Sequence, residues 1–101
     1  MSKRVVAVTG GARGIGRAIC QVFSTKNYDI LFTYNRSRQS AEQLLEQLQS
    51  VCHVESMQVD VSNHENVRGL FELCQVKFGR LDVLINCASH SSKSGWNIKP
   101  E

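Results

Sequence analysis

A glycine-rich turn between an apolar run and an amphipathic segment constrains this chain more than any other feature. The apolar run covers residues 5–8, and residues 9–16 then read Thr-Gly-Gly-Ala-Arg-Gly-Ile-Gly. Strand, glycine turn and helix in this order distinguish a dinucleotide site from chance glycines. The glycines allow a sharp turn, close approach of backbone to a diphosphate, and close packing of helix on strand. We therefore expect a cofactor to be bound by Gly10, Arg13, Gly14, Ile15 and Gly16.

The segment after the turn is predicted to be a helix. This prediction favours a binding turn over the alternative, in which the turn is structural and binds nothing. Its apolar residues recur at helical spacing and would form one face: Ile15, Ala18, Ile19, Val22 and Phe23. The N-terminus of such a helix offers unpaired N–H groups and the positive end of its dipole to phosphates.

The rest of the chain alternates between predicted strands and helices. We expect further strands at residues 29–34, 54–59 and 81–86, and a first helix near 14–25. Capping boxes at Ser40–Gln43 and Ser62–Glu65 predict the starts of two more helices. The last helix should end before Gly79, with an inner face made by Val67, Leu70, Phe71, Cys74 and Phe78.

This alternation predicts an α/β fold that corresponds to the N-terminal half of a Rossmann domain. The parallel sheet should have strand order 3-2-1-4, with two helices on one face and the third on the other. We assign residues 1–89 to this partial domain and residues 90–101, which lack periodicity, to an irregular tail. In that arrangement the fourth strand would be an open, apolar edge.

Composition excludes several other classes of protein. No apolar run is long enough to span a membrane, and the first strand begins too close to Met1 for a cleavable signal peptide. The cytoplasm is the expected compartment, with the mitochondrial matrix as the open alternative. The four cysteines lack metal-site spacing with the histidines, so no metal is predicted. Cys20 and Cys74 lie on or beside the apolar faces of predicted helices and are expected to be buried and reduced.

Basic residues are concentrated in the first 38 positions, which contain seven lysines and arginines but only one acidic residue, Asp29. Nucleic-acid binding would account for such a bias, but no basic helix face interleaved with aromatic residues is present. Arg36, with Asn35 before it, stands where an acidic side chain would receive the ribose 2′-hydroxyl of NAD. A guanidinium there suits a 2′-phosphate, and Arg13 is placed to assist, so we predict NADP(H) over NAD(H).

The turn, together with residues 78–86, Asp60-Val61 and Asn86-Cys87-Ala88-Ser89, resembles the short-chain dehydrogenase/reductase family. Within it the chain is most similar to 3-oxoacyl-[acyl-carrier-protein] reductases and carbonyl reductases. The resemblance implies that Asp60 and Val61 hold the adenine, and that Asn86 and Ala88 line the cofactor ribose and stabilise the sheet. Cys87 and Ser89 depart from the Asn-Asn-Ala-Gly usual there.

The family resemblance also implies a reaction: hydride transfer from NADP(H) to a small carbonyl substrate, in a whole protein that forms homo-oligomers. The family uses a Ser, a Tyr-x-x-x-Lys pair and a further Asn, and neither Tyr28 nor Tyr34 has a lysine four residues later. We therefore assign no catalytic residue and expect these 101 residues to be inactive alone. The alternatives are a non-catalytic nucleotide-binding or subunit-pairing module and an inert fragment.

Overall fold

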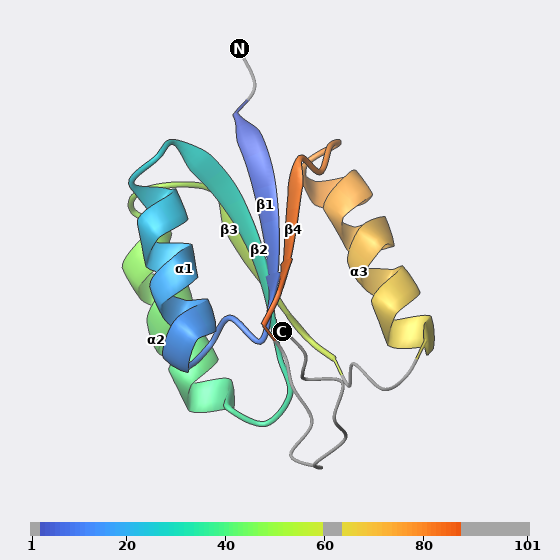
Figure 1. The fold of residues 1–101 in the computed structure, drawn as a ribbon, viewed down its shortest axis with the longest axis horizontal. Helices are drawn as coiled ribbons and strands as arrows, with labels where there is room; N and C mark the ends of the chain where they lie inside the picture. Colours follow the sequence, from blue (N-terminus) through green and yellow to red (C-terminus); the bar gives the residue numbers. More distant parts are fainter. Residues whose placement is uncertain (1–2, 60–63, 88–101) are drawn as a thin grey trace, which may run out of the picture.

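Strands and helices alternate along the chain in the computed structural model, which describes residues 3–59 and 64–87 (Figure 1). In chain order they are β1 (Arg4–Thr9), α1 (Gly14–Ser24), β2 (Tyr28–Tyr34), α2 (Arg38–Leu48), β3 (Val54–Gln58), α3 (His64–Lys77) and β4 (Val83–Asn86). The expected strand boundaries therefore shift by one residue at both ends of β1, at the start of β2 and at the end of β3, and by two at the start of β4.

All four strands are parallel and lie in the order β3-β2-β1-β4. Val6 of β1 pairs with Ile30 of β2 on one side and with Val83 of β4 on the other. Helices α1 and α2 cover one face of the sheet and α3 covers the other (Figure 1). The predicted fold, strand order and distribution of helices are confirmed.

The apolar residues of β1 divide between two core clusters, one on each face of the sheet. Val6 and Val8 belong to the cluster beneath α1 and α2, whereas Val5 and Ala7 belong to the cluster beneath α3. All four side chains are at most 1% exposed. Successive strand residues point to opposite faces, so a central strand of this fold is apolar at every position.

The face that α1 turns to the sheet agrees only in part with the predicted apolar face. Its buried residues are the small ones, Gly16, Cys20 and Ser24, whereas Ile15 is 75% exposed and Val22 is 51% exposed. The reason is the closeness of helix and strand, since a Cβ atom on Gly16 would lie 2.1 Å from the carbonyl oxygen of Gly10. A row of small residues is needed there, and of the larger apolar row only Ile19 and Phe23 stay partly buried against the core, whereas Ile15 and Val22 lie toward solvent.

The predicted capping box at Ser40 is wrong. Helix α2 begins at Arg38 after Ser37, and the Ala41 N–H donates to the Ser37 carbonyl at 2.8 Å. Ser40 is therefore already inside the first turn, because the loop after β2 is shorter than the capping pattern implied. The second predicted box involves Ser62, which lies outside the described residues.

Helix α3 agrees with its predicted inner face at Leu70, Cys74 and the partly buried Phe78 but not at Phe71, and the side chain of Val67 lies outside what the structure describes. Leu70 and Cys74 are buried against the sheet, whereas Phe71 is 44% exposed. Phe71 was expected on the inner face, and this part of the prediction is wrong. Gly79 ends the helix as predicted, with a positive φ of 78° and an N–H that donates to the Cys74 and Gln75 carbonyls.

The start of β4 is fastened to β1 by Asp82. The Val5 N–H donates to a carboxylate oxygen of Asp82 at 2.8 Å, and the Asp82 N–H donates to the Val5 carbonyl at 2.9 Å. Arg80 donates to both carboxylate oxygens, at 2.9 and 2.7 Å. The Arg80 guanidinium and the Val5 N–H together hold the pKa of Asp82 below its ordinary value.

Candidate functional site

The glycine turn lies at the carboxyl end of β1, where it leads into the N-terminus of α1. Gly10 and Gly14 have positive φ angles, 71° and 59°, which glycine adopts without strain. A Cβ atom on Gly14 would meet nothing within 4 Å. Arg13 is the N-cap residue of α1 and makes no side-chain capping bond. The turn thus presents an open surface and the N–H groups of a helix start to a ligand.

Thr33, near the end of β2, holds this turn in place. Its Oγ1 accepts a hydrogen bond from the Gly10 N–H at 3.2 Å, and its carbonyl accepts one from the Gly11 N–H at 2.9 Å. The side chain is only 1% exposed. Sequence reasoning missed Thr33, and the available signal was a polar residue within an otherwise apolar strand.

Gly11, also absent from the predicted site, is required by close packing under the turn. A Cβ atom there would lie 2.7 Å from the Cβ atom of Phe32 and 3.0 Å from the Cys20 sulfur. The turn therefore rests directly on the core, without room for a side chain between them. Its backbone is positioned by packing as well as by Thr33.

The carboxyl end of β4 meets the same turn through Thr9. The Thr9 hydroxyl lies 2.6 Å from the Asn86 side-chain oxygen, to which it donates. The Cys87 N–H donates to the Thr9 carbonyl at 3.0 Å and to its hydroxyl oxygen at 3.1 Å. Asn86 is thereby brought beside the turn, and its role toward the cofactor stays a prediction. Ala88, Asp60 and Val61 lie outside the described residues, so their predicted roles stay predictions.

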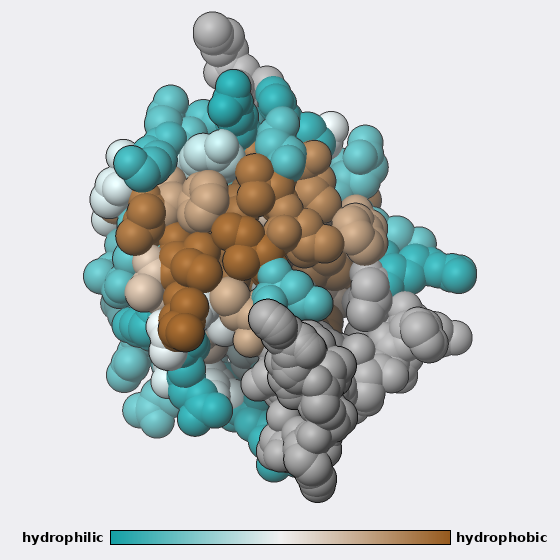
Figure 2. Space-filling model, in the orientation of Figure 1, coloured by the Kyte–Doolittle hydropathy of each residue, from teal (hydrophilic) through white to brown (hydrophobic). Residues whose placement is uncertain are grey.

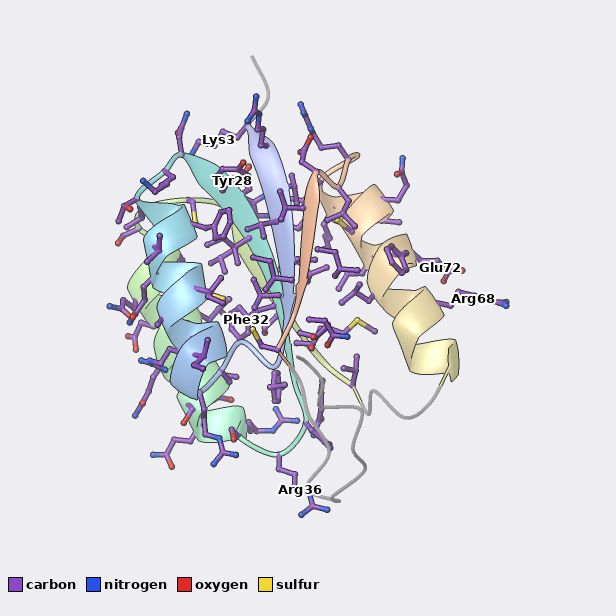
Figure 3. The ribbon with its side chains drawn as sticks, in the orientation of Figure 1. Lys3, Tyr28, Phe32, Arg36, Arg68 and Glu72 are labelled. Carbon is purple, nitrogen blue, oxygen red and sulfur yellow. The ribbon has the colours of Figure 1, made fainter. Side chains whose placement is uncertain are left out.

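Arg13 and Arg36 follow two neighbouring strands at their carboxyl ends. Both are exposed, and Arg36 extends away from the ribbon below the sheet (Figure 3). Between residues 3–59 and 64–87, the ion pairs involve neither of these two arginines. The loop that carries Arg36 is tied to β3, because the Gln58 side chain donates to the Asn35 carbonyl at 2.9 Å. Two exposed guanidinium groups that could bind an anion therefore lie at the carboxyl ends of the central strands β1 and β2.

Arg17, one helical turn further along α1, has a structural role. Its guanidinium donates to the Ser40 carbonyl at 3.2 Å and to the Ala12 carbonyl at 3.4 Å. These bonds connect α1 to the first turn of α2 and keep the guanidinium from the turn's open face. The basic residues among the first 38 positions therefore include an arginine with a structural role, Arg17, as well as the exposed Arg13 and Arg36.

Cys20 lies directly beneath the turn, with its sulfur 3.9 Å from the Gly11 carbonyl. Burial, with smaller contributions from the Cys87 and Cys52 thiols, raises the pKa of Cys20 to about 12. The group is therefore a neutral packing residue. All four cysteines are free; Cys20 and Cys74 are buried, as predicted, and Cys52 is buried as well.

Residues 3–59 and 64–87 contain neither a cluster of metal-ligating side chains nor a helix that could span a membrane. No three His, Cys, Asp or Glu side chains gather there into a metal site. No helix in that part of the chain has the length and apolar character needed to cross a bilayer. Tyr28 packs edge-on against Phe23, with ring centroids 4.8 Å apart, and is thus part of the packing around α1.

The known proteins that this chain resembles in sequence are dehydrogenases and reductases. The family model for short chain dehydrogenases matches residues 4–98. Glucose and ribitol dehydrogenase homolog 2 of Arabidopsis thaliana is 36% identical over 93 residues, which are 85% of this chain and 32% of that protein. A 3-oxoacyl-[acyl-carrier-protein] reductase of Staphylococcus aureus is 34% identical over 83 residues, which are 80% of this chain and 33% of the reductase.

Solved structures agree with the sequence comparison. A blue fluorescent protein from a metagenomic library, solved in complex with NADPH, superposes with a TM-score of 0.83 at 34% identity. The match covers 88% of this chain and 37% of that protein. A short-chain dehydrogenase from Oenococcus oeni gives a TM-score of 0.83 at 25% identity, over 92% of this chain and 43% of its own. The chain spans about a third of the length of the curated relatives it matches.

Proposed function

Because this chain belongs to the short-chain dehydrogenase family, whose model matches residues 4–98, we propose that it is the NADP(H)-binding part of an oxidoreductase. The reaction of the whole protein is reduction of a small carbonyl compound to an alcohol. The observation that carries the proposal is the open glycine turn at the start of α1, held by Thr33 and flanked by two exposed arginines.

The chain's own residues fit the cofactor in three places. The turn and the uncapped start of α1 would hold the diphosphate through backbone N–H groups, and side-chain-free Gly14 leaves the approach open. Arg36, with Arg13 assisting, would bind the 2′-phosphate. Asp60 and Val61 would hold the adenine, as the family resemblance implies, and Ala88 would line the ribose beside Asn86.

A bound nicotinamide cofactor supplies the hydride for carbonyl reduction. The carbonyl oxygen also needs a proton donor with a tuned pKa. The two tyrosines of this chain, Tyr28 and Tyr34, belong to β2 and neither is followed by a lysine at the fourth position. We therefore propose that these 101 residues bind cofactor without turnover.

A second candidate function is a nucleotide-binding module that pairs with another polypeptide. It is favoured by the position of β4, an apolar strand at the edge of the sheet. Both candidate functions use the same cofactor site. They differ in whether this chain is part of a catalytic oxidoreductase or a non-catalytic module bound to another polypeptide.

Titration with fragments of the cofactor tests the proposal without requiring a complete nicotinamide pocket. Adenosine 2′,5′-bisphosphate should bind the chain about tenfold or more tightly than adenosine 5′-monophosphate, because only the former carries the phosphate that Arg36 would bind. Equal affinities would contradict an NADP(H) site. The absence of binding by either compound would favour the inert fragment. NADPH oxidation by the chain with a panel of ketones, above that of a heat-treated sample, would contradict the proposed lack of turnover.

A further inference from the structure

A glutamine at the end of β3 contacts the loop that carries Arg36. Gln58 pairs with Tyr34 in the parallel register of β3 and β2, so it lies beside the point at which β2 leads into that loop. The side-chain N–H of Gln58 donates to the Asn35 carbonyl at 2.9 Å. Its side-chain oxygen accepts a hydrogen bond from the Arg38 guanidinium at 3.3 Å. One side chain of β3 therefore contacts the residue before Arg36 and the first residue of α2.

The two ends of the Gln58 amide have partners of opposite kinds. A guanidinium only donates hydrogen bonds and a carbonyl only accepts them, so a single orientation of the amide satisfies both. A glutamate at this position would accept from Arg38 but would have no hydrogen to donate to Asn35, and its negative charge would oppose the binding of an anion. Both contacts together therefore require a neutral amide.

The neutral amide holds Arg38 without cancelling its charge. The Arg38 guanidinium also lies 4.0 Å from a carboxylate oxygen of Glu42, one helical turn further along α2. The side chains of that pair are 64% and 67% exposed, and exposed ion pairs of this kind contribute little in water. Contact with Gln58 thus holds the guanidinium beside the loop while its charge remains available to a ligand.

The surroundings of this loop are polar. Figure 2 shows hydrophobic side chains over α1, and the coloured surface below them turns hydrophilic toward the end of the molecule at which β2 leads into α2 (Figures 1 and 2). Asn35, Arg36, Arg38 and Gln58 are all exposed. Two guanidinium groups two positions apart, in a polar setting, suit a phosphate, whose oxygens accept charge-assisted hydrogen bonds.

We propose that Gln58 is a positioning residue for the cofactor's 2′-phosphate, and that Arg38 is a second arginine that binds this phosphate together with Arg36. The inference rests on the proposed NADP(H) site and names the residues that set its preference for the phosphate. Long exposed side chains lose conformational freedom when they bind a ligand. The two hydrogen bonds of Gln58 restrain the loop and Arg38 before binding, which reduces this loss for the phosphorylated cofactor alone.

Titration of the full chain with two cofactor fragments tests this role. Gln58→Met removes both hydrogen bonds at similar side-chain length, and it should weaken binding of adenosine 2′,5′-bisphosphate about threefold to tenfold. Binding of adenosine 5′-monophosphate should stay within about twofold. An unchanged affinity for the bisphosphate, or an equal loss for both compounds, would overturn the proposal.

Gln47→Met is the matched control. Gln47 is an exposed glutamine near the end of α2, and its side-chain oxygen accepts a hydrogen bond from Gln21 at 3.2 Å. The variant therefore makes the same chemical change away from the loop, and it should alter neither affinity by more than about twofold. A loss of bisphosphate affinity equal to that of Gln58→Met would contradict a specific role of Gln58.

A double-mutant cycle tests whether Gln58 acts through Arg38. Arg38→Met should weaken bisphosphate binding by at least as much as Gln58→Met does. Because the two residues share one hydrogen bond, the loss in the double variant should be clearly smaller than the product of the two single losses. A loss equal to that product would overturn the positioning of Arg38 by Gln58.

Trypsin cleavage reports on the loop without any ligand. Cleavage after Arg36 requires local release of the backbone, so it should be several times faster in Gln58→Met than in the wild type. Cleavage after the exposed Lys26, between α1 and β2, is the internal reference and should not change. An unchanged rate after Arg36 would overturn the proposal.

The fragment titration distinguishes failure of this inference from failure of the proposed function. A wild-type chain that binds both fragments equally would contradict the NADP(H) site itself. A wild-type chain that prefers the bisphosphate, with a Gln58→Met variant that keeps the full preference, would overturn only the role of Gln58.

Discussion

The side chain of Thr33 accepts a hydrogen bond from the Gly10 N–H across 3.2 Å, which joins β2 to the turn that follows β1. The Thr33 carbonyl accepts the next N–H, that of Gly11, at 2.9 Å. Two consecutive amides are thereby oriented by one residue 23 positions away. The orientation of the turn, on which diphosphate binding depends, is a tertiary property of the sheet.

Replacing Thr33 tests this coupling. Thr33→Val keeps the shape but removes the acceptor of the Gly10 N–H, so we expect the free energy of unfolding to fall by about 1–3 kcal/mol. NADPH affinity should fall as well, because the turn loses one of its two bonds to Thr33. Thr33→Ser retains the hydroxyl and should preserve most of the affinity. Urea denaturation and fluorescence titration provide the two readouts. Equal affinity in the valine and serine variants would show that the bond does not orient the turn.

Close packing of α1 on the turn predicts that Gly16 tolerates no side chain. In Gly16→Ala the new Cβ atom would lie 2.1 Å from the Gly10 carbonyl oxygen, a backbone atom that cannot move alone. We expect a loss of about 3 kcal/mol, in the upper range for overpacking. Gly69→Ala is the matched control in α3, because its Cβ would lie 3.1 Å from the flexible end of Met57. Its stability should be unchanged or rise by up to about 1 kcal/mol from helix propensity. Similar losses in thermal unfolding would contradict the packing argument.

The bonds to Asp82 predict a contribution to stability that depends on pH. The pKa of Asp82 is lowered in the folded chain, first by the Arg80 hydrogen bond and then by the Val5 N–H. A lowered folded pKa stabilises the fold above the unfolded pKa of about 3.9, and this stabilisation is lost as pH falls through the folded value. The melting temperature of Asp82→Asn should therefore lie below that of the wild type at pH 7, and the difference should shrink below about pH 4. A constant difference across this range would argue against an ionised Asp82 as the cause.

The order of the elements was predictable because each short segment carries its own signal. Continuous apolar runs at β1 and β2, with helical spacing between them, require parallel strands with crossover helices. The roles of Gly10, Gly14 and Gly16 follow from the same local pattern. Residues 64–77 similarly show where α3 lies without any tertiary information.

What could not be predicted depends on contacts between distant segments. The spacing of Ile15 and Val22 identifies an apolar row on α1 but not what covers it. The residues of α1 buried in the structure are the small ones, and only part of the apolar row packs against the core. Phe71 was misplaced for the same reason, because helical spacing does not tell which of the adjacent apolar residues Leu70 and Phe71 the sheet covers. Thr33 gave only a weak local signal, since its partner is an amide 23 residues earlier.

Cofactor affinities of an Arg36 variant test the central claim most directly. Arg36→Asp removes the guanidinium proposed to bind the 2′-phosphate, so NADPH affinity should fall roughly tenfold to a hundredfold, for one charge-assisted bond of about 1.5–3 kcal/mol. NADH affinity should change little. Arg68→Asp makes the same charge change at an exposed site on α3, on the other face of the sheet (Figure 3), and should affect neither cofactor. Equal loss of NADPH and NADH binding in the Arg36 variant would contradict the account.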